Sequence, residues 1–173
     1  MKHWKNVLSA MALLVMSMTG IVTAQSNDDV VVLSVDILTL TDGEVSEIIT
    51  VTFDMPELQA FPAVSFKTET IWTEGEQTFK GVSLAALVSH LGVTSGTLRA
   101  QAINDYVVDI PVSNAVEGGP IIAYERNGAP MSIRDKGPLW IVYPYDNNSD
   151  YKTEEIFSQS VWQLVRITVK PAN

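Results

Sequence analysis

Short runs of β-branched and aromatic residues, separated by turn-forming residues, recur along this chain and constrain its fold more than any other feature. Runs of four to ten such residues bounded by glycine, proline, asparagine or aspartate are typical of β-strands. The sequence predicts strands at 30–40, 48–53, 64–70, 78–81, 97–103, 106–111, 121–125, 138–142 and 161–169. Asn127-Gly128 is a hairpin-type turn, and residues 138–142 are apolar on both faces, which favours a central strand.

Two segments carry helix signals instead. Asp54, with Pro56 just after it, predicts a short helix over 54–61. Ser83 and Gly92 bracket leucines at helical spacing and predict a second helix, with Ser83 as its N-cap. The polar residues 146–155 predict a surface loop. The fold class expected is α+β, mostly β, with mixed sheets and two or three short helices.

The first residues have the pattern of an export signal. A basic start leads into an apolar stretch over 7–22, and Val22-Thr23-Ala24 offers small residues for cleavage after Ala24. The stretch of about 16 residues is short of the roughly 20 that span a bilayer. We therefore expect a signal peptide at 1–24, one domain at 25–173 and a periplasmic location.

Charge and composition exclude several classes of function. Because Lys2 and Lys5 lie in the signal, 9 of the 11 basic side chains remain against all 20 acidic ones, a net charge of −11. This charge disfavours nucleic acid and anionic lipid as partners. Cysteine is absent, which excludes thiol nucleophiles and cysteine-ligated metals. His90 is the one histidine outside the signal, and its place in the last turn of the second helix favours a structural role.

Aromatic and polar residues gather at four predicted strand ends or turns, namely 70–74, 104–106, 132–138 and 143–146. Tryptophan or tyrosine beside carboxylates suits a flat, nitrogen-rich ring, which stacks on an aromatic face and donates N–H bonds to a carboxylate. The same residues would also serve as caps of the core with their polar ends in water. Aspartates in these segments have no calcium-loop spacing, and no pair of acids is fixed at a distance that would indicate glycoside hydrolysis.

Several motifs, taken in order, resemble the sulfite-oxidase-type molybdopterin-binding fold. They are Gly81-Val82-Ser83-Leu84 with Leu87 and Gly92, Asn127-Gly128-Ala129-Pro130-Met131, Gly137 to Pro144, and Ser160 to Ile167, together with Phe61-Pro62. They cover most of residues 48–170. The resemblance implies that fold and a pterin-type cofactor.

The chain departs from that family where a metal ligand belongs. Catalytic members bind molybdenum through a cysteine just after the strand that 64–70 resembles, and here Thr68-Glu69-Thr70-Ile71-Trp72 stands in that region. A hydroxyl is a poor substitute for a thiolate on this metal. Cations that could hold the cofactor's phosphate are few, with Arg126, Arg134 and Lys136 as the one local cluster. These departures disfavour molybdenum, and we expect no metal site and no catalytic residue.

The chain is similar to a small group of exported, cysteine-free members of this fold that bind pterins without molybdenum. That resemblance implies a tetrahydropterin-type ligand and, as partner, the periplasmic domain of a membrane signalling protein that makes and degrades cyclic di-GMP. The candidate ligand-binding residues are Trp72, Asn104, Asp105, Tyr106, Arg134, Asp135, Tyr143, Tyr145, Ser160 and Trp162.

Each candidate residue has an expected role. Trp72 and one of Tyr106, Tyr143 or Tyr145 would sandwich the ring. Asp105 or Asp135 would accept bonds from its 2-amino and N3–H groups. Arg134 and Asn104 would contact its 4-oxo group or side chain, and Ser160 and Trp162 would form the wall. Two other functions stay open, namely a molybdenum oxidoreductase with an unusual ligand set and a ligand-free interaction module.

Overall fold

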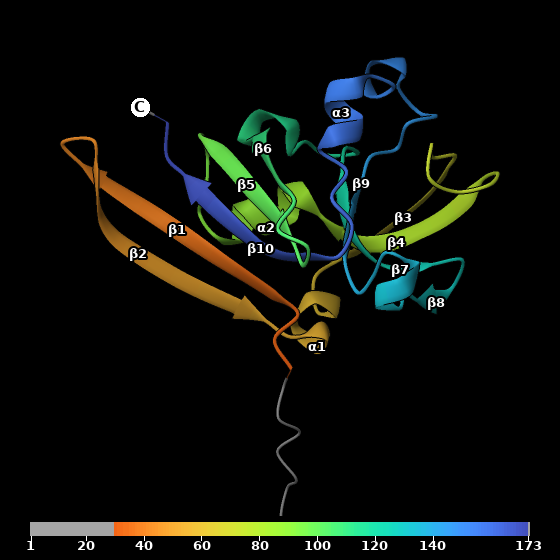
Figure 1. Ribbon diagram of the computed structural model, residues 1–173, viewed down its shortest axis with the longest axis horizontal. Coiled ribbons are helices and arrows are strands. Elements are labelled where there is room, and N and C mark those ends of the chain that lie inside the picture. The colour runs from red at the N-terminus through yellow and green to blue at the C-terminus, as the bar shows by residue number, and fades with distance from the viewer. Residues whose placement is uncertain (1–29, 173) are drawn as a thin grey trace, which may run out of the picture.

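The computed structural model describes residues 30–172, which form two five-stranded sheets and three short α-helices (Figure 1). The predicted signal peptide and its cleavage after Ala24 lie outside the described residues. Strands dominate and one strand pair is parallel while the others are antiparallel, so the mostly β, α+β prediction with mixed sheets is confirmed. Within 30–172, no helix has the length and apolar character needed to cross a bilayer.

The first sheet has the strand order β2-β1-β10-β5-β6. Its strands are β1 (Leu33–Thr41), β2 (Glu44–Phe53), β5 (Thr97–Ala102), β6 (Val107–Pro111) and β10 (Leu164–Lys170). β10, the last strand of the chain, lies between β1 and β5, parallel to β1 and antiparallel to β5. β1 and β2 form a long hairpin that extends away from the rest of the molecule (Figure 1).

The second sheet has the order β3-β4-β7-β8, with β9 also paired to β7. Its strands are β3 (Ala63–Thr68), β4 (Gln77–Ser83), β7 (Ile121–Arg126), β8 (Ala129–Pro130) and β9 (Trp140–Val142). Gly81 allows a close approach of β4 to β7, since a Cβ there would lie 2.0 Å from the Ile122 carbonyl oxygen. Asn127 and Gly128 both have positive φ, which confirms the hairpin turn between β7 and β8.

The helices are α1 (Met55–Gln59), α2 (Leu84–His90) and α3 (Glu154–Ser158). Asp54 starts α1 as predicted, with a full capping box, because its side chain accepts from the Glu57 N–H and Glu57 accepts from its N–H. Ser83 precedes α2, but its side chain makes no capping bond. Gly92 has a φ of +70° and ends α2 as predicted.

Two sequence-based assignments need correction. Residues 146–155 are not only a loop, because they contain the 3-10 helix η3 (Ser149–Tyr151) and the start of α3. The strand predicted at 138–142 is shorter and pairs regularly only with β7, although it is fully buried as its apolar residues required. One core joins the two sheets, and its largest fully buried side chains include Trp140, Tyr143, Tyr145 and Phe79.

Candidate ligand-binding pocket

Five of the ten predicted site residues line one pocket of about 290 Å³. Trp72 comes from the loop between β3 and β4, and Asn104 and Tyr106 come from the turn between β5 and β6. Ser160 and Trp162 lie between α3 and β10. The complete lining consists of Trp72, Ala102, Asn104, Tyr106, Phe157, Ser158, Ser160, Val161 and Trp162. Segments far apart in the sequence therefore converge on this space.

The indole of Trp72 sits at the centre of the aromatic part of the lining. Its ring centroid lies 5.5 Å from that of Trp162 and 5.9 Å from that of Phe157, with interplanar angles of 69° and 87°. Trp72 also contacts the buried Trp140 edge to face. These angles are the favoured edge-to-face geometry of aromatic pairs. The rings therefore form angled walls, and the pocket is not a parallel slot between two planes.

A buried hydroxyl provides the polar point of the lining. Ser160 is 2% exposed, and its Oγ lies 3.0 Å from the Ile156 carbonyl oxygen, to which it donates. The Tyr145 hydroxyl is also hydrogen-bonded to Ser160 Oγ. Since Ser160 has one proton and gives it to Ile156, Tyr145 must be the donor of the second bond. One lone pair of Ser160 Oγ remains without a partner among the described residues.

Tyr106 connects the two sides of the pocket. Its hydroxyl donates to the Ser158 carbonyl oxygen at 2.8 Å, which joins the β5–β6 turn to the end of α3. The Asn104 carboxamide oxygen accepts from the Tyr106 N–H at 3.3 Å, so the amide N–H groups of Asn104 are left for other partners. The Tyr106 ring and the Asn104 side-chain amide are therefore held next to each other in the pocket lining.

The other two tyrosines are core residues, which corrects their expected placement beside the ligand. Tyr143 and Tyr145 are 0% and 1% exposed, and neither lines the pocket. The Tyr143 hydroxyl donates to Gln159 Oε1 at 2.8 Å, and that of Tyr145 supports Ser160. Burial raises the pKa of Tyr145 to about 12 and raises that of Tyr143 further. Their rings are already packed on protein, so neither can sandwich a ligand with Trp72.

Asp105, Arg134 and Asp135 are exposed and lie outside the lining, which also corrects the expected geometry. Asp105 has a φ of +63° at the tip of its turn, and its carboxylate accepts from the Gln101 side chain at 3.1 Å. Asp135 ends the 3-10 helix η2 (Ile133–Asp135) and accepts at 2.7 Å from the hydroxyl of Ser132, the N-cap of that helix. Both carboxylates therefore serve local turns, and no charged side chain lines the pocket.

Lys136 lies against two of the tryptophans around the pocket, Trp162 and Trp140. Lys136 Nζ is 4.9 Å from the centroid of the Trp162 ring and 5.8 Å from that of Trp140, which is cation–π distance. Lys136 is not itself part of the lining. Its charge is therefore held against an aromatic face and stabilises the position of Trp162.

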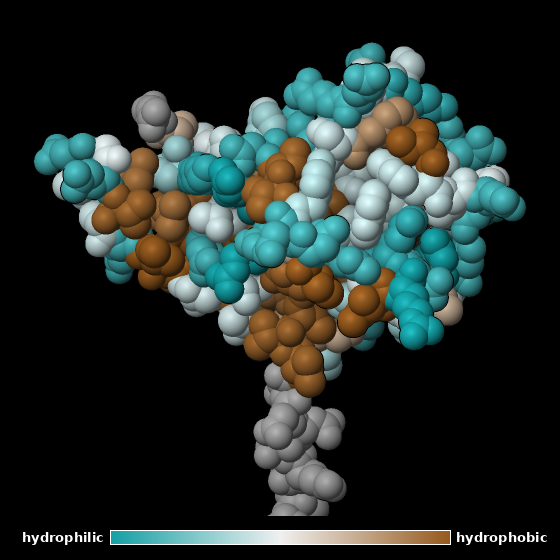
Figure 2. All heavy atoms as spheres, in the orientation of Figure 1, coloured by the Kyte–Doolittle hydropathy of each residue, from teal (hydrophilic) through white to brown (hydrophobic). Residues whose placement is uncertain are grey.

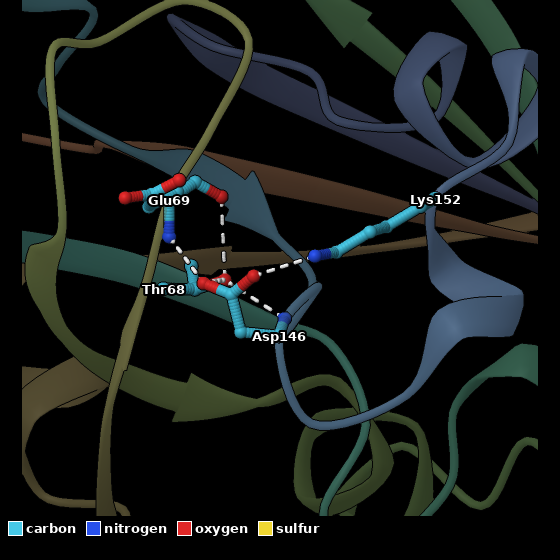
Figure 3. A network of polar contacts seen from close by, with 4 residues as sticks. All are labelled: Thr68, Glu69, Asp146 and Lys152. Carbon is cyan, nitrogen blue, oxygen red and sulfur yellow. Dashed lines mark hydrogen bonds and ion pairs between the residues drawn. The ribbon is translucent and has the colours of Figure 1, made fainter.

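The end of β3 and the residues just after it, where the resemblance expects a metal-binding cysteine, contain a hydrogen-bond network (Figure 3). Thr68 Oγ1 and the Glu69 N–H both donate to Asp146 Oδ2, at 3.2 and 2.7 Å. Lys152 Nζ lies 2.7 Å from Asp146 Oδ1. The hydrogen bond from Lys152, followed by that from the Glu69 N–H, lowers the pKa of Asp146. The Thr70 hydroxyl is bonded to that of Thr73 at 2.7 Å.

The family model described as "Oxidoreductase molybdopterin binding domain" matches residues 33–146. The chain belongs to this family. A search of curated proteins finds no match. The matched residues contain the Trp72, Asn104 and Tyr106 side of the pocket, whereas the Phe157–Trp162 side follows the end of the match.

The pocket residues fit one part of a molybdopterin cofactor and not the rest. Aromatic walls and a hydroxyl acceptor suit the flat pterin ring. The chain has no cysteine to bind molybdenum, and the hydroxyls of Thr68 and Thr70 are both hydrogen-bonded within the protein. Within residues 30–172, no three His, Asp or Glu side chains gather as a metal site, and no lysine or arginine lines the pocket to hold a phosphate. The lining therefore provides neither a metal ligand nor a cation for a phosphate.

Four lining residues were not predicted, namely Ala102, Phe157, Ser158 and Val161. Ala102 and Val161 have no chemistry that distinguishes them from core residues in a sequence. Phe157 and Ser158 belong to α3, whose start lies in the polar segment 146–155 that predicts a surface loop. Thr153 caps α3 and is followed by two glutamates, a pattern that would have indicated the helix.

Proposed function

We propose that this chain is a periplasmic pterin-binding sensor and not an enzyme. It binds the ring of a tetrahydropterin in the pocket around Trp72. The bound form regulates the membrane protein that makes and degrades cyclic di-GMP through that protein's periplasmic domain. The observation that carries the proposal is a neutral, aromatic-walled pocket in a cysteine-free member of the molybdopterin-binding family.

The size and walls of the pocket support a small flat ligand. A volume of about 290 Å³ is at the low end of small-molecule pockets, which are roughly 300–1,000 Å³. It suits a bicyclic ring better than a complete cofactor with a metal and a phosphate. Stacking on an aromatic face contributes roughly 0.5–1.5 kcal/mol beyond burial. Trp72 and Trp162 provide such faces.

The polar groups of the lining are complementary to the edge of a pterin. Its 2-amino and N3–H groups are donors and match the free lone pair of Ser160 Oγ. Its 4-oxo group is an acceptor and matches the free amide N–H groups of Asn104. Net hydrogen bonds of roughly 0.5–1.5 kcal/mol each, added to ring burial and stacking, are compatible with the roughly −8 kcal/mol of a micromolar complex.

Absence of the thiolate ligand supports a role without oxotransfer, and the predicted export signal supports action outside the cytoplasm. A binding protein without chemistry of its own needs another protein to report its state. The membrane-bound cyclic di-GMP enzyme is the partner that the sequence resemblance suggests. Its complex with this chain should therefore change when the pocket is occupied.

Calorimetric titration of the mature protein with tetrahydrobiopterin tests the binding claim. We expect saturable binding of one ligand per chain with a micromolar or lower Kd. Trp72→Ala should weaken it at least tenfold, about 1.4 kcal/mol, because it removes the central wall. Ile71→Ala is the matched control, since this neighbouring side chain is 64% exposed and outside the pocket. No saturable heat, or equal affinity in Trp72→Ala, contradicts the proposal.

Elemental analysis of protein purified from its native periplasm separates the sensor from an oxidoreductase. The sensor contains a pterin and no stoichiometric molybdenum. Molybdenum at one atom per chain would establish the oxidoreductase instead.

Co-purification of the membrane protein tests the partner. The amount recovered should differ between wild type and Trp72→Ala, whereas an interaction module without a ligand predicts no difference.

A further inference from the structure

The outer strand of the β1–β2 hairpin is an open sheet edge. β2 pairs only with β1 among the described strands, from Glu44 to Phe53, with Ser46 left unpaired at a bulge. Backbone N–H and C=O groups on its other side therefore have no strand partner. Such an edge is a template for pairing with another chain.

The side chains of this edge are unusually apolar for an exposed strand. Val45, Ile48 and Ile49 are 53%, 57% and 49% exposed. Apolar residues gather over the hairpin, with hydrophilic residues at its tip (Figure 2). The register sets Leu38 opposite Ile48 and Leu40 opposite Val45, so both strands add to one apolar face. β2 contains neither lysine nor proline, the residues that commonly block such edges.

All charged side chains of the hairpin itself are acidic. Residues 30–66 contain six acidic side chains and no lysine or arginine. Asp36 is paired with Arg166, and Asp54 and Glu57 form the capping box of α1. The other three are Asp42, Glu44 and Glu47, for which the described part of the chain provides no ion pair. Apolar contacts and a local negative charge thus coincide on one free edge.

We propose that β2 is a docking edge for an extended segment of a protein partner in which apolar residues alternate with lysine or arginine. Such a segment adds a strand beside β2 through backbone hydrogen bonds, and its side chains select the register. Its cations meet Glu44 and Glu47. A second copy of this chain fits less well, because a parallel pairing of two β2 strands sets these glutamates against each other. An antiparallel pairing over the full strand brings Glu44 toward Asp54.

The inference does not depend on the pocket. β2 shares no residue with the pocket lining, so the docking edge stands or fails whether or not a pterin binds. The experiment can therefore be done on the protein without ligand.

The test is binding of a synthetic peptide of the same length as β2 that alternates valine with lysine and threonine. We expect saturable binding to the mature protein, protection of β2 amides from hydrogen exchange, and weaker binding at high salt because the charges are exposed. A matched peptide with glutamate in place of lysine should bind about tenfold more weakly. Glu44→Lys with Glu47→Lys should weaken the lysine peptide about tenfold and remove its preference over the glutamate peptide.

Glu74→Lys with Glu117→Lys is the control for net charge, since both glutamates are exposed and lie away from β2. This control should bind the lysine peptide within about twofold of wild type. The proposal is overturned by no saturable peptide binding, by equal losses in the two double variants, or by protection outside β2. Protein that sediments as a dimer with protected β2 amides before peptide is added would assign the edge to a second copy instead.

Discussion

The aromatic pocket and the β1–β2 hairpin use apolar side chains in opposite ways. Around the pocket, Trp72 packs on the fully buried Trp140, and neighbouring rings hold each other at fixed angles. Along β2, only Phe53 is buried. The pocket therefore takes its shape from the core, whereas the exposed side chains of β2 can be altered with little effect on folding. This difference separates a pocket with rigid walls from an exposed strand.

Truncation of one apolar residue in each region should give the largest contrast. Trp140→Ala is expected to lower the free energy of unfolding by about 3–5 kcal/mol, because it leaves a cavity in the core. Ile48→Ala should change it by no more than about 0.5 kcal/mol, as is usual at the surface. Urea denaturation of the two variants measures both values. Similar losses at the two sites would remove the distinction between the regions.

Alkaline pH should affect the pocket through Tyr145. Its pKa is raised to about 12 in the folded state, above the usual value near 10, because the buried ring disfavours the phenolate. Stability from this group is therefore complete below pH 10 and is lost as pH rises toward 12. A shift of two pKa units corresponds to roughly 3 kcal/mol of the free energy of unfolding, which is lost over this pH range.

Tyr145→Phe isolates that contribution. This variant should lose roughly 0.5–1.5 kcal/mol at neutral pH with the hydrogen bond to Ser160, and its stability should then fall less steeply between pH 10 and 12. Denaturation midpoints across this range provide the measurement. A variant whose pH dependence equals that of wild type would contradict the burial of a neutral Tyr145.

Asp146 should have a smaller effect, through the network after β3. Asp146→Ala removes the acceptor of the Glu69 N–H and one of the two acceptors of the buried Thr68 hydroxyl, and should cost roughly 0.5–1.5 kcal/mol. Asp146→Asn keeps an oxygen acceptor and should cost less. The pKa of Asp146 is lowered in the folded state, so its stabilising contribution is present above the usual pKa of aspartate and is lost as pH falls through the folded value. Acid denaturation that is identical in wild type and Asp146→Asn would argue against this role.

The smallest effect is expected from the two aspartates outside the pocket. Asp105→Ala and Asp135→Ala together should leave the affinity for tetrahydrobiopterin within about twofold, because both carboxylates bond within their own turns. Calorimetry compares the double variant with wild type. A tenfold loss would mean that a carboxylate reaches the ligand and that the pocket is larger than its present lining.

The sequence predicted most strands because each is bounded by turn residues, and it grouped Trp72, Asn104 and Tyr106, which line one pocket, because aromatic and amide residues gather at predicted strand ends. It could not place Tyr143 and Tyr145 correctly. Their burial depends on Gln159 and Ser160, which satisfy the hydroxyls from a distant part of the chain. Nor could it orient Asp105, since an aspartate at a turn tip can face either side. Family membership, in contrast, was confirmed by the match over 33–146.

The most direct test of the pocket uses its own tryptophans. Trp4 lies in the predicted signal, so the mature protein has Trp72, Trp140 and Trp162, all within one aromatic cluster. In an NMR titration with tetrahydrobiopterin, the indole N–H signals of Trp72 and Trp162 should shift to saturation at one equivalent, with those of exposed β2 amides unchanged. Indole signals that stay in place while the pterin is in excess would contradict binding in this pocket.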